Sequence, residues 1–151
     1  MKIQLFLVPA IVMVSPVYAN EPAEVRELAT NYMTLRNEKK YDELIEKCVC
    51  REHATDAIMK ATRQVLGFGG KIQSFKIEKA TDKDKQLFKE GAVLGDHGRL
   101  YSNLDPVWVI VFSIPSSGAT LNGAPLASTE RVTVGQVGDQ WRISMLTPKK
   151  S

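Results

Sequence analysis

The sequence is poor in the residues and motifs that most catalytic and metal sites require. It contains only two histidines, His53 and His97, and two cysteines, Cys48 and Cys50. It has no Gly-x-Ser-x-Gly nucleophile elbow, no phosphate-cradling glycine loop and no His-Glu-x-x-His pair. Each histidine is therefore interpreted as part of a surface or a link, and we expect no catalytic residue and no cofactor.

An excess of charge of either sign is also absent. Twenty Lys and Arg residues stand against 17 Asp and Glu residues, which gives a formal net charge of +3. Nucleic-acid-binding proteins usually gather their basic residues on one face, whereas the lysines here are scattered. Segment 79–90 mixes both signs and is expected to form a solvated edge or turn. We therefore expect no nucleic-acid partner.

The N-terminal apolar run is short. Lys2 is the only charged residue before Glu21, and prolines at positions 9 and 16 interrupt the apolar stretch. Spanning a bilayer takes about 20 apolar residues, so the run, followed by small residues up to Ala19, is typical of a signal peptide over residues 1–19. We expect a single domain over residues 20–151, exported to the periplasm or secreted, with no membrane anchor after cleavage.

Hydrophobic periodicity predicts three helices before any strand. The first follows Pro22, the second covers residues 41–48 and the third runs from about residue 54 to 66. Glycines in segment 67–70 are expected to end the third helix in the left-handed conformation. The residues expected to face inward are Val25, Leu28, Ala29, Tyr32 and Leu35 in the first helix, Tyr41, Leu44, Ile45 and Cys48 in the second, and Ile58, Ala61, Thr62 and Val65 in the third.

From residue 71 onwards the pattern alternates as in strands. Residues 71–80 predict a strand with polar ends, and "VWVIVFSI", apolar on both faces, is typical of a central strand. "TERVTVGQVGDQWRISML" predicts two antiparallel strands joined by a turn at residues 137–140. Segment 81–106 is ambiguous, with a short strand near "QLFKE" and a turn at "LGDHG". The sequence thus predicts an α+β domain whose three N-terminal helices cover one face of an antiparallel sheet.

Two stretches resemble a known family. "YMTLRNEKKYDELIEKC" is similar to the helix-turn-helix opening of the nuclear transport factor 2-like superfamily, also called SnoaL-like or cystatin-like, and "VGQVGDQWRISML" resembles its last hairpin. The resemblance implies a cone, in which a bent antiparallel sheet wraps the helices and leaves an apolar cavity at its open end. It also implies that a homodimer could form through the sheet.

Some members of that superfamily are isomerases, in which a tyrosine on the first helix donates a hydrogen bond and an aspartate accepts a proton. Tyr32 stands at the matching position relative to "LRNEKKYD". The neighbours of Asp56 do not match the family pattern, so the role of the base is not transferred to it. The resemblance therefore supplies a hydrogen-bond donor without its base.

Large apolar side chains are the remaining candidates for a ligand pocket. Tyr32, Leu35, Trp108 and Trp141 are proposed as pocket residues. Tryptophan can stack on a flat ligand, but in strands it more often forms part of the core. Trp141 is expected in the core, in phase with Ile143, whereas the position of Trp108 is left open.

The stretch "EKCVCREH" places both cysteines and His53 within six residues. Cys48 is expected to complete the buried stripe of the second helix, while Cys50 faces solvent in the link between the second and third helices. A strained local disulfide and a zinc or copper site remain open alternatives. Structural zinc requires four ligands, so no metal ligand is assigned.

Together these observations predict an exported, non-catalytic binding or interaction module of the bacterial envelope, which could hold a small apolar ligand or a protein partner. The alternative is a small enzyme of the isomerase or dehydratase type that uses Tyr32 as hydrogen-bond donor in the same cavity.

Overall fold

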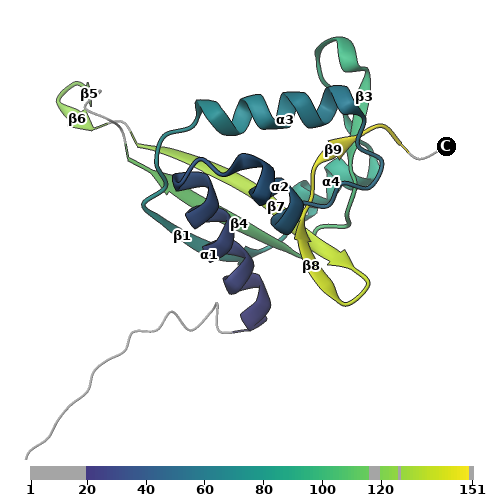
Figure 1. The fold of residues 1–151 in the computed structure, drawn as a ribbon, viewed down its shortest axis with the longest axis horizontal. Helices are drawn as coiled ribbons and strands as arrows, with labels where there is room; N and C mark the ends of the chain where they lie inside the picture. Colours follow the sequence, from purple (N-terminus) through teal and green to yellow (C-terminus); the bar gives the residue numbers. More distant parts are fainter. Residues whose placement is uncertain (1–19, 116–119, 126, 150–151) are drawn as a thin grey trace, which may run out of the picture.

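The computed structural model describes residues 20–115, 120–125 and 127–149. Three helices, α1 (Ala23–Asn37), α2 (Tyr41–Cys48) and α3 (Asp56–Phe68), precede the first strand and lie on one side of the main sheet (Figure 1). The α+β class predicted from the sequence is confirmed. The predicted signal peptide, residues 1–19, lies outside the described residues. Within the described part of the chain, no helix has the length and apolar character needed to cross a bilayer.

The main sheet is antiparallel and follows the strand order β1-β4-β7-β8. Its strands are β1 (Ser74–Lys79), β4 (Trp108–Ile114), β7 (Ser128–Val137) and β8 (Gln140–Ile143). β4 has a neighbour on both sides and is buried along almost its whole length, as expected for a strand that is apolar on both faces. β7 and β8 form the predicted hairpin.

Short strands complete the fold. β2 (Ala92–Val93), β3 (Arg99–Ser102) and β9 (Leu146–Thr147) make a three-stranded sheet, and the 3₁₀ turn η2 (Gly95–His97) lies in the connection between β2 and β3. β5 (Thr120–Leu121) and β6 (Ala124–Pro125) form a separate two-stranded ribbon.

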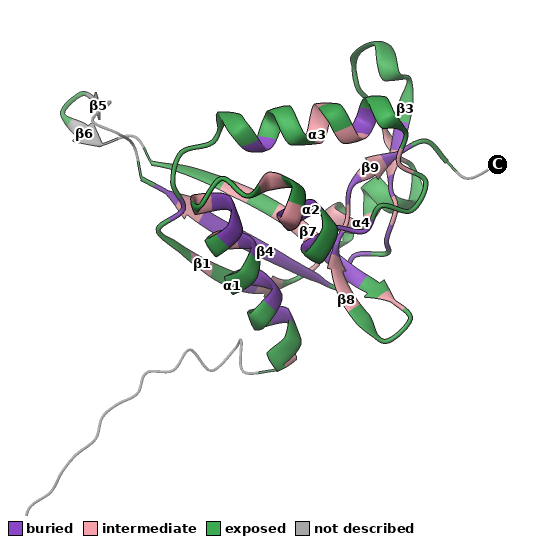
Figure 2. Cartoon of the chain, in the orientation of Figure 1, coloured by how far each residue is buried: buried purple, intermediate pink, exposed green. Residues whose placement is uncertain are grey.

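The core lies between α1, α2 and the main sheet. All five predicted inward residues of α1 are buried, and Figure 2 shows this buried stripe facing the buried strand β4. The ring of Tyr32 stacks on Phe112 of β4, with 4.8 Å between the ring centroids and an angle of 18°. Such aromatic pairs add to the free energy gained from buried area alone.

Segment 81–106 contains a helix where a strand was predicted. α4 (Asp82–Lys89) begins with a capping box, in which the Thr81 hydroxyl accepts a hydrogen bond from the Asp84 amide and the Asp84 carboxylate accepts one from the Thr81 amide. The expected strand near "QLFKE" is therefore wrong, because the cap satisfies the free amides of a helix start. η2 occupies the expected turn at "LGDHG".

α4 packs beside β3 and is joined to the main sheet on the face opposite Glu130 and the three N-terminal helices. Arg131 of β7 donates hydrogen bonds to Asp84 of α4 at 3.0 Å and to Glu78 of β1 at 3.4 Å. Its cross-strand neighbour Val111 is buried on that face. Charged side chains thus extend over the apolar residues that β4 turns away from the helices.

α3 differs from the prediction on two points. Ile58 is buried as expected, and Ala61 and Thr62 are half-buried, but Val65 is 68% exposed. The helix continues to Phe68 and ends at Gly69, whose φ of −78° and ψ of 149° are ordinary extended values. The expected left-handed glycine cap is wrong, so this glycine has another role.

Candidate functional site

A cavity of about 410 Å³ lies between α3 and the strands below it. This volume falls in the range of small-molecule sites. α3 forms one wall and β3, β7 and the segment around β8 and β9 form the other, with α1 contributing Tyr32. The lining residues are Tyr32, Val49, Ile58, Ala61, Thr62, Val65, Leu66, Leu94, His97, Leu100, Glu130, Val132, Ile143, Ser144, Met145 and Leu146.

The walls are mostly aliphatic, and the hydroxyl groups among them are already engaged. The Thr62 hydroxyl donates to the carbonyl of Ile58 at 2.8 Å. The Ser144 hydroxyl is hydrogen-bonded to that of Thr133. The cavity therefore offers an apolar surface with few polar groups aimed into it.

One end of the cavity carries a charged cluster. The Tyr32 hydroxyl donates to Oε1 of Glu130 at 2.5 Å, and Nη1 of Arg36 donates to Oε2 of the same carboxylate. Nη1 also lies 3.4 Å from the Tyr32 oxygen. Arg36 and Tyr32 are almost fully buried, whereas the Glu130 side chain keeps 26% of its surface exposed. Tyr32 and Glu130 both line the cavity, and Glu130 is the more exposed of the two.

Burial and the charge on Glu130 set the protonation of this cluster. Burial, together with the adjacent carboxylate, raises the pKa of Tyr32 far above its ordinary value, so the hydroxyl keeps its proton. Burial acts against the charge on Arg36, but the hydrogen bond and attraction to Glu130 outweigh it and raise the pKa of Arg36. The cluster consists of a neutral phenol and a neutralised ion pair.

Gly69 gives Arg36 the space it needs. A β-carbon at Gly69 would lie 1.6 Å from Nη2 and 2.8 Å from Cζ of Arg36. The guanidinium therefore packs directly against the backbone just after α3. Its Nε atom is buried without a hydrogen-bond partner among the described residues.

The four residues predicted to line a pocket are separated in the structure. Tyr32 lines the cavity, but Leu35, Trp108 and Trp141 are not among its lining residues. Trp108 is buried at 7% exposure, with the Lys79 ammonium 5.8 Å from its ring centroid. Trp141 was expected in the core, and it packs against the core but is only half-buried.

The two cysteines are both buried free thiols. Cys48 is 1% exposed, as predicted, and burial raises its pKa to about 11. Cys50 was expected to face solvent, but it is 4% exposed, and burial raises its pKa also. The prediction for Cys50 is wrong because the link pairs with β8, where the Cys50 amide donates to the Ile143 carbonyl at 2.8 Å.

Asn103 also binds the link between α2 and α3. Its amide nitrogen donates to the carbonyls of Cys50 and Glu52 at 2.8 and 3.0 Å, and its oxygen accepts from the Met145 amide at 2.9 Å. A single side chain thereby joins the link to the segment between β8 and β9.

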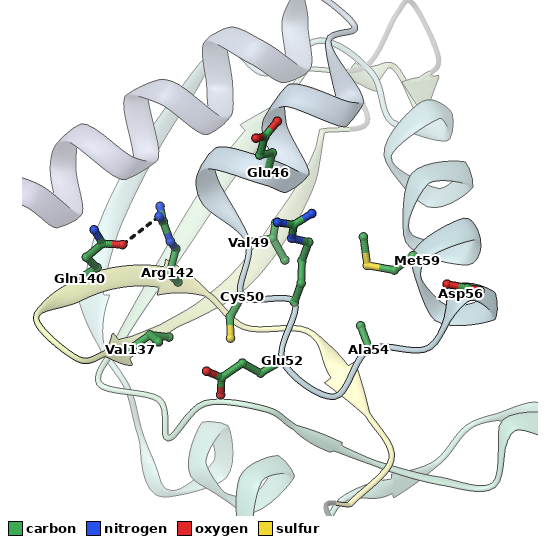
Figure 3. Close-up of a pocket in the computed structure, with 11 residues that line it drawn as sticks. Glu46, Val49, Cys50, Glu52, Ala54, Asp56, Met59, Val137, Gln140 and Arg142 are labelled. Carbon is green, nitrogen blue, oxygen red and sulfur yellow. Dashed lines mark hydrogen bonds between the residues drawn. The ribbon is translucent and has the colours of Figure 1, made fainter.

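Cys50 borders an open groove of about 780 Å³, and Figure 3 shows its sulfur pointing between Val137 and Glu52. The charged groups there carry both signs and do not converge, and Arg142 donates to Gln140 at 2.9 Å. Across the described residues, no group of three or more His, Cys, Asp or Glu side chains is placed to hold a metal ion. The groove is a weaker candidate for a site than the apolar cavity.

Arg36 and Glu130 were not selected from the sequence. Arg36 follows Tyr32 by four residues and so shares the inward face of α1, and Glu130 alternates with Val132 and Val134 on the inward face of β7. Two charges of opposite sign, each in phase with the apolar residues of its own element, were the signal that could have revealed the pair.

Comparison with known proteins finds no matching family model, no matching curated protein and no matching solved structure.

Proposed function

We propose that this protein is an exported, non-catalytic domain of nuclear transport factor 2-like shape that binds one small apolar ligand in the cavity between α3 and the sheet. The observation that carries the proposal is the cavity itself, which is large enough for a small molecule and almost entirely apolar in its walls. The resemblance of the first two helices and the last hairpin to that superfamily supports the same location for a ligand.

The rim of the cavity supports binding from solution. Val65 on α3 and Leu94 beside η2 both line the cavity, and they are 68% and 43% exposed. When a ligand covers apolar side chains around an opening, their surface is removed from water, and this burial favours binding. This pair gives an incoming apolar molecule its first contact.

The hydrogen bonds of Tyr32 favour binding over catalysis. An isomerase of the expected type would direct the tyrosine proton at its substrate, but here that proton is donated to Glu130. Glu130 is in turn paired with Arg36. Proton transfer to a ligand would first require this cluster to open.

Export is the second part of the proposal, and the apolar leader over residues 1–19 supports it. Intact mass measurement of protein recovered from outside the cytoplasm is expected to give a chain that begins at Asn20. Soluble protein that retains residues 1–19 would contradict export and would leave the binding proposal unaffected.

Pyrene, a hydrocarbon fluorophore without polar groups, tests the binding site directly. We expect saturable binding of one pyrene per chain, measured by the change in its fluorescence. Ala61→Trp fills the cavity from α3 and should abolish this binding, whereas Gln64→Trp, on an exposed position of the same helix, should leave it intact. Equal pyrene binding by both folded variants would overturn the proposal.

A further inference from the structure

We propose that Glu130 selects a ligand that carries a neutral hydrogen-bond donor, such as a hydroxyl group, at the end that lies against the charged cluster. The ligand class is thus an apolar alcohol rather than a fatty acid. This inference rests on the proposed binding function and adds to it the chemistry of the ligand's polar end.

Glu130 retains acceptor capacity toward the cavity. An ionised carboxylate has about four lone-pair positions, and described residues use one on each oxygen, through Tyr32 and Arg36. The side chain lines the cavity and is 26% exposed. A ligand hydroxyl can therefore donate to Glu130 without displacing either protein donor.

Among the described lining residues, the donors nearest Glu130 already have protein partners, and His97 lines the cavity from η2. The protons of Tyr32 and Thr62 are donated to protein acceptors, and the hydroxyls of Ser144 and Thr133 share one hydrogen bond in which either can be the donor. Arg36 is absent from the lining, because its guanidinium lies behind the carboxylate and against Gly69. A ligand carboxylate placed beside Glu130 would lose its hydration and lie against a second carboxylate, which is costly for a charged group.

The charge balance favours a neutral donor over a cation. Arg36 already compensates the charge of Glu130 within the protein. An ammonium group would add a positive charge that no further described lining carboxylate can offset, because Glu130 is the only acidic residue in that lining. Burying an uncompensated charge costs more than burying a hydroxyl that makes one hydrogen bond.

The shape of the cavity suits an extended molecule. The lining residues of α3 run from Ile58 to Leu66, a length of about 12 Å at the helical rise. Arg36, which bonds both Tyr32 and Glu130, packs beside the end of α3, while Ile58 lies near its start. The acceptor therefore stands at one end of the cavity, where it can meet the end of a chain.

The test compares three compounds of similar size by displacement of bound pyrene: 1-octanol, its isomer 1-methoxyheptane, which has no donor, and octanoate. We expect 1-octanol to bind at least about tenfold more tightly than each of the others, as one charge-assisted hydrogen bond provides. Equal or weaker binding of 1-octanol overturns the inference. If pyrene binds and 1-octanol shows no preference, only the inference fails. If pyrene does not bind, the proposed function fails, and the inference that rests on it fails too.

A triple variant assigns the preference to Glu130. Arg36→Met with Glu130→Leu removes both charges together, which proteins often tolerate when the replacements pack well, and Tyr32→Phe removes the hydroxyl that would otherwise lose its acceptor. This variant should still bind pyrene and should bind 1-octanol and 1-methoxyheptane with affinities within about twofold of each other. A preference for the alcohol that survives in the variant overturns the role of Glu130. The wild-type series decides the ligand class whether or not the variant folds.

Discussion

Arg36 and Gly69 lie in such close contact that the glycine has no room for a side chain. An added β-carbon would stand 1.6 Å from Nη2, and the arginine is held in place by Glu130. Since the backbone angles of Gly69 suit alanine, the cost of Gly69→Ala comes from displacing the guanidinium. We expect a loss of about 1 to 3 kcal/mol in the free energy of unfolding, measured by urea denaturation.

Gly67 provides the matched control two residues earlier. It lies inside α3, and its added β-carbon would be 3.9 Å from Tyr41, an ordinary contact. Gly67→Ala should therefore stabilise the protein by about 0.5 to 1 kcal/mol through helix propensity. Equal effects of the two substitutions would show that Arg36 does not pack against Gly69.

Removing the acid of the buried pair should be far more harmful than removing an exposed one. Glu130→Ala leaves the almost fully buried Arg36 without its partner and should cost about 3 to 5 kcal/mol of unfolding free energy. Asp42→Ala breaks the solvent-exposed pair with Arg63 and should cost less than about 1 kcal/mol. Chemical denaturation of the two variants measures both values, and similar losses would contradict the burial of Arg36.

The raised pKa of Tyr32 predicts that the folded protein loses stability in alkaline solution. Its pKa is raised in the folded protein, first by burial and then by Glu130, so its contribution is fully present below the unfolded value near 10 and is lost at higher pH. The difference in unfolding free energy between wild type and Tyr32→Phe should therefore fall above pH 10. The limiting slope is about 1.4 kcal/mol per pH unit. A difference that stays constant up to pH 11 would mean that the hydroxyl ionises freely in the folded state.

Both thiols should react slowly with a thiol reagent in the native protein at pH 8, and both should react rapidly after unfolding. A pKa of about 11 leaves roughly one Cys48 molecule in a thousand as thiolate at that pH. Cys50→Ala isolates Cys48 for comparison. Rapid native labelling of Cys50 would contradict its burial, and labelling that requires prior reduction would indicate the local disulfide.

The two tryptophans should differ in their contribution to stability. Trp108→Ala removes a buried ring from β4 and should cost about 3 to 5 kcal/mol. Trp141→Ala removes a half-buried ring at the edge of the core and should cost clearly less. Urea denaturation measures the difference in unfolding free energy, and a larger loss for Trp141 would contradict the burial described for the two rings.

Local patterns in the sequence were enough to predict much of the fold. The stripe of α1, the short helix α2, the central strand β4 and the final hairpin each depend on residues close together in the chain. α4 was missed although its signal is local, because Thr81 and Asp84 form a capping box inside a highly charged segment. Charge there was interpreted as solvent exposure alone.

The site was harder to predict, because its contacts join distant parts of the chain. Tyr32 was selected, but Glu130, its hydrogen-bond partner, lies 98 residues away. The burial of Cys50 likewise depends on pairing with Ile143. Neither neighbour can be inferred from periodicity, since a pattern predicts which face of an element is inward but not what it meets there.

The distance between Arg36 and Glu130 along the chain has a consequence for synthesis. α1 leaves the ribosome early, and its arginine must wait for β7 before it meets an acid. A chain that stops short of β7 would also leave β4 with an unpaired edge. Without Glu130, burying the arginine is unfavourable, so we expect a chain truncated before β7 to stay open and accessible to proteases.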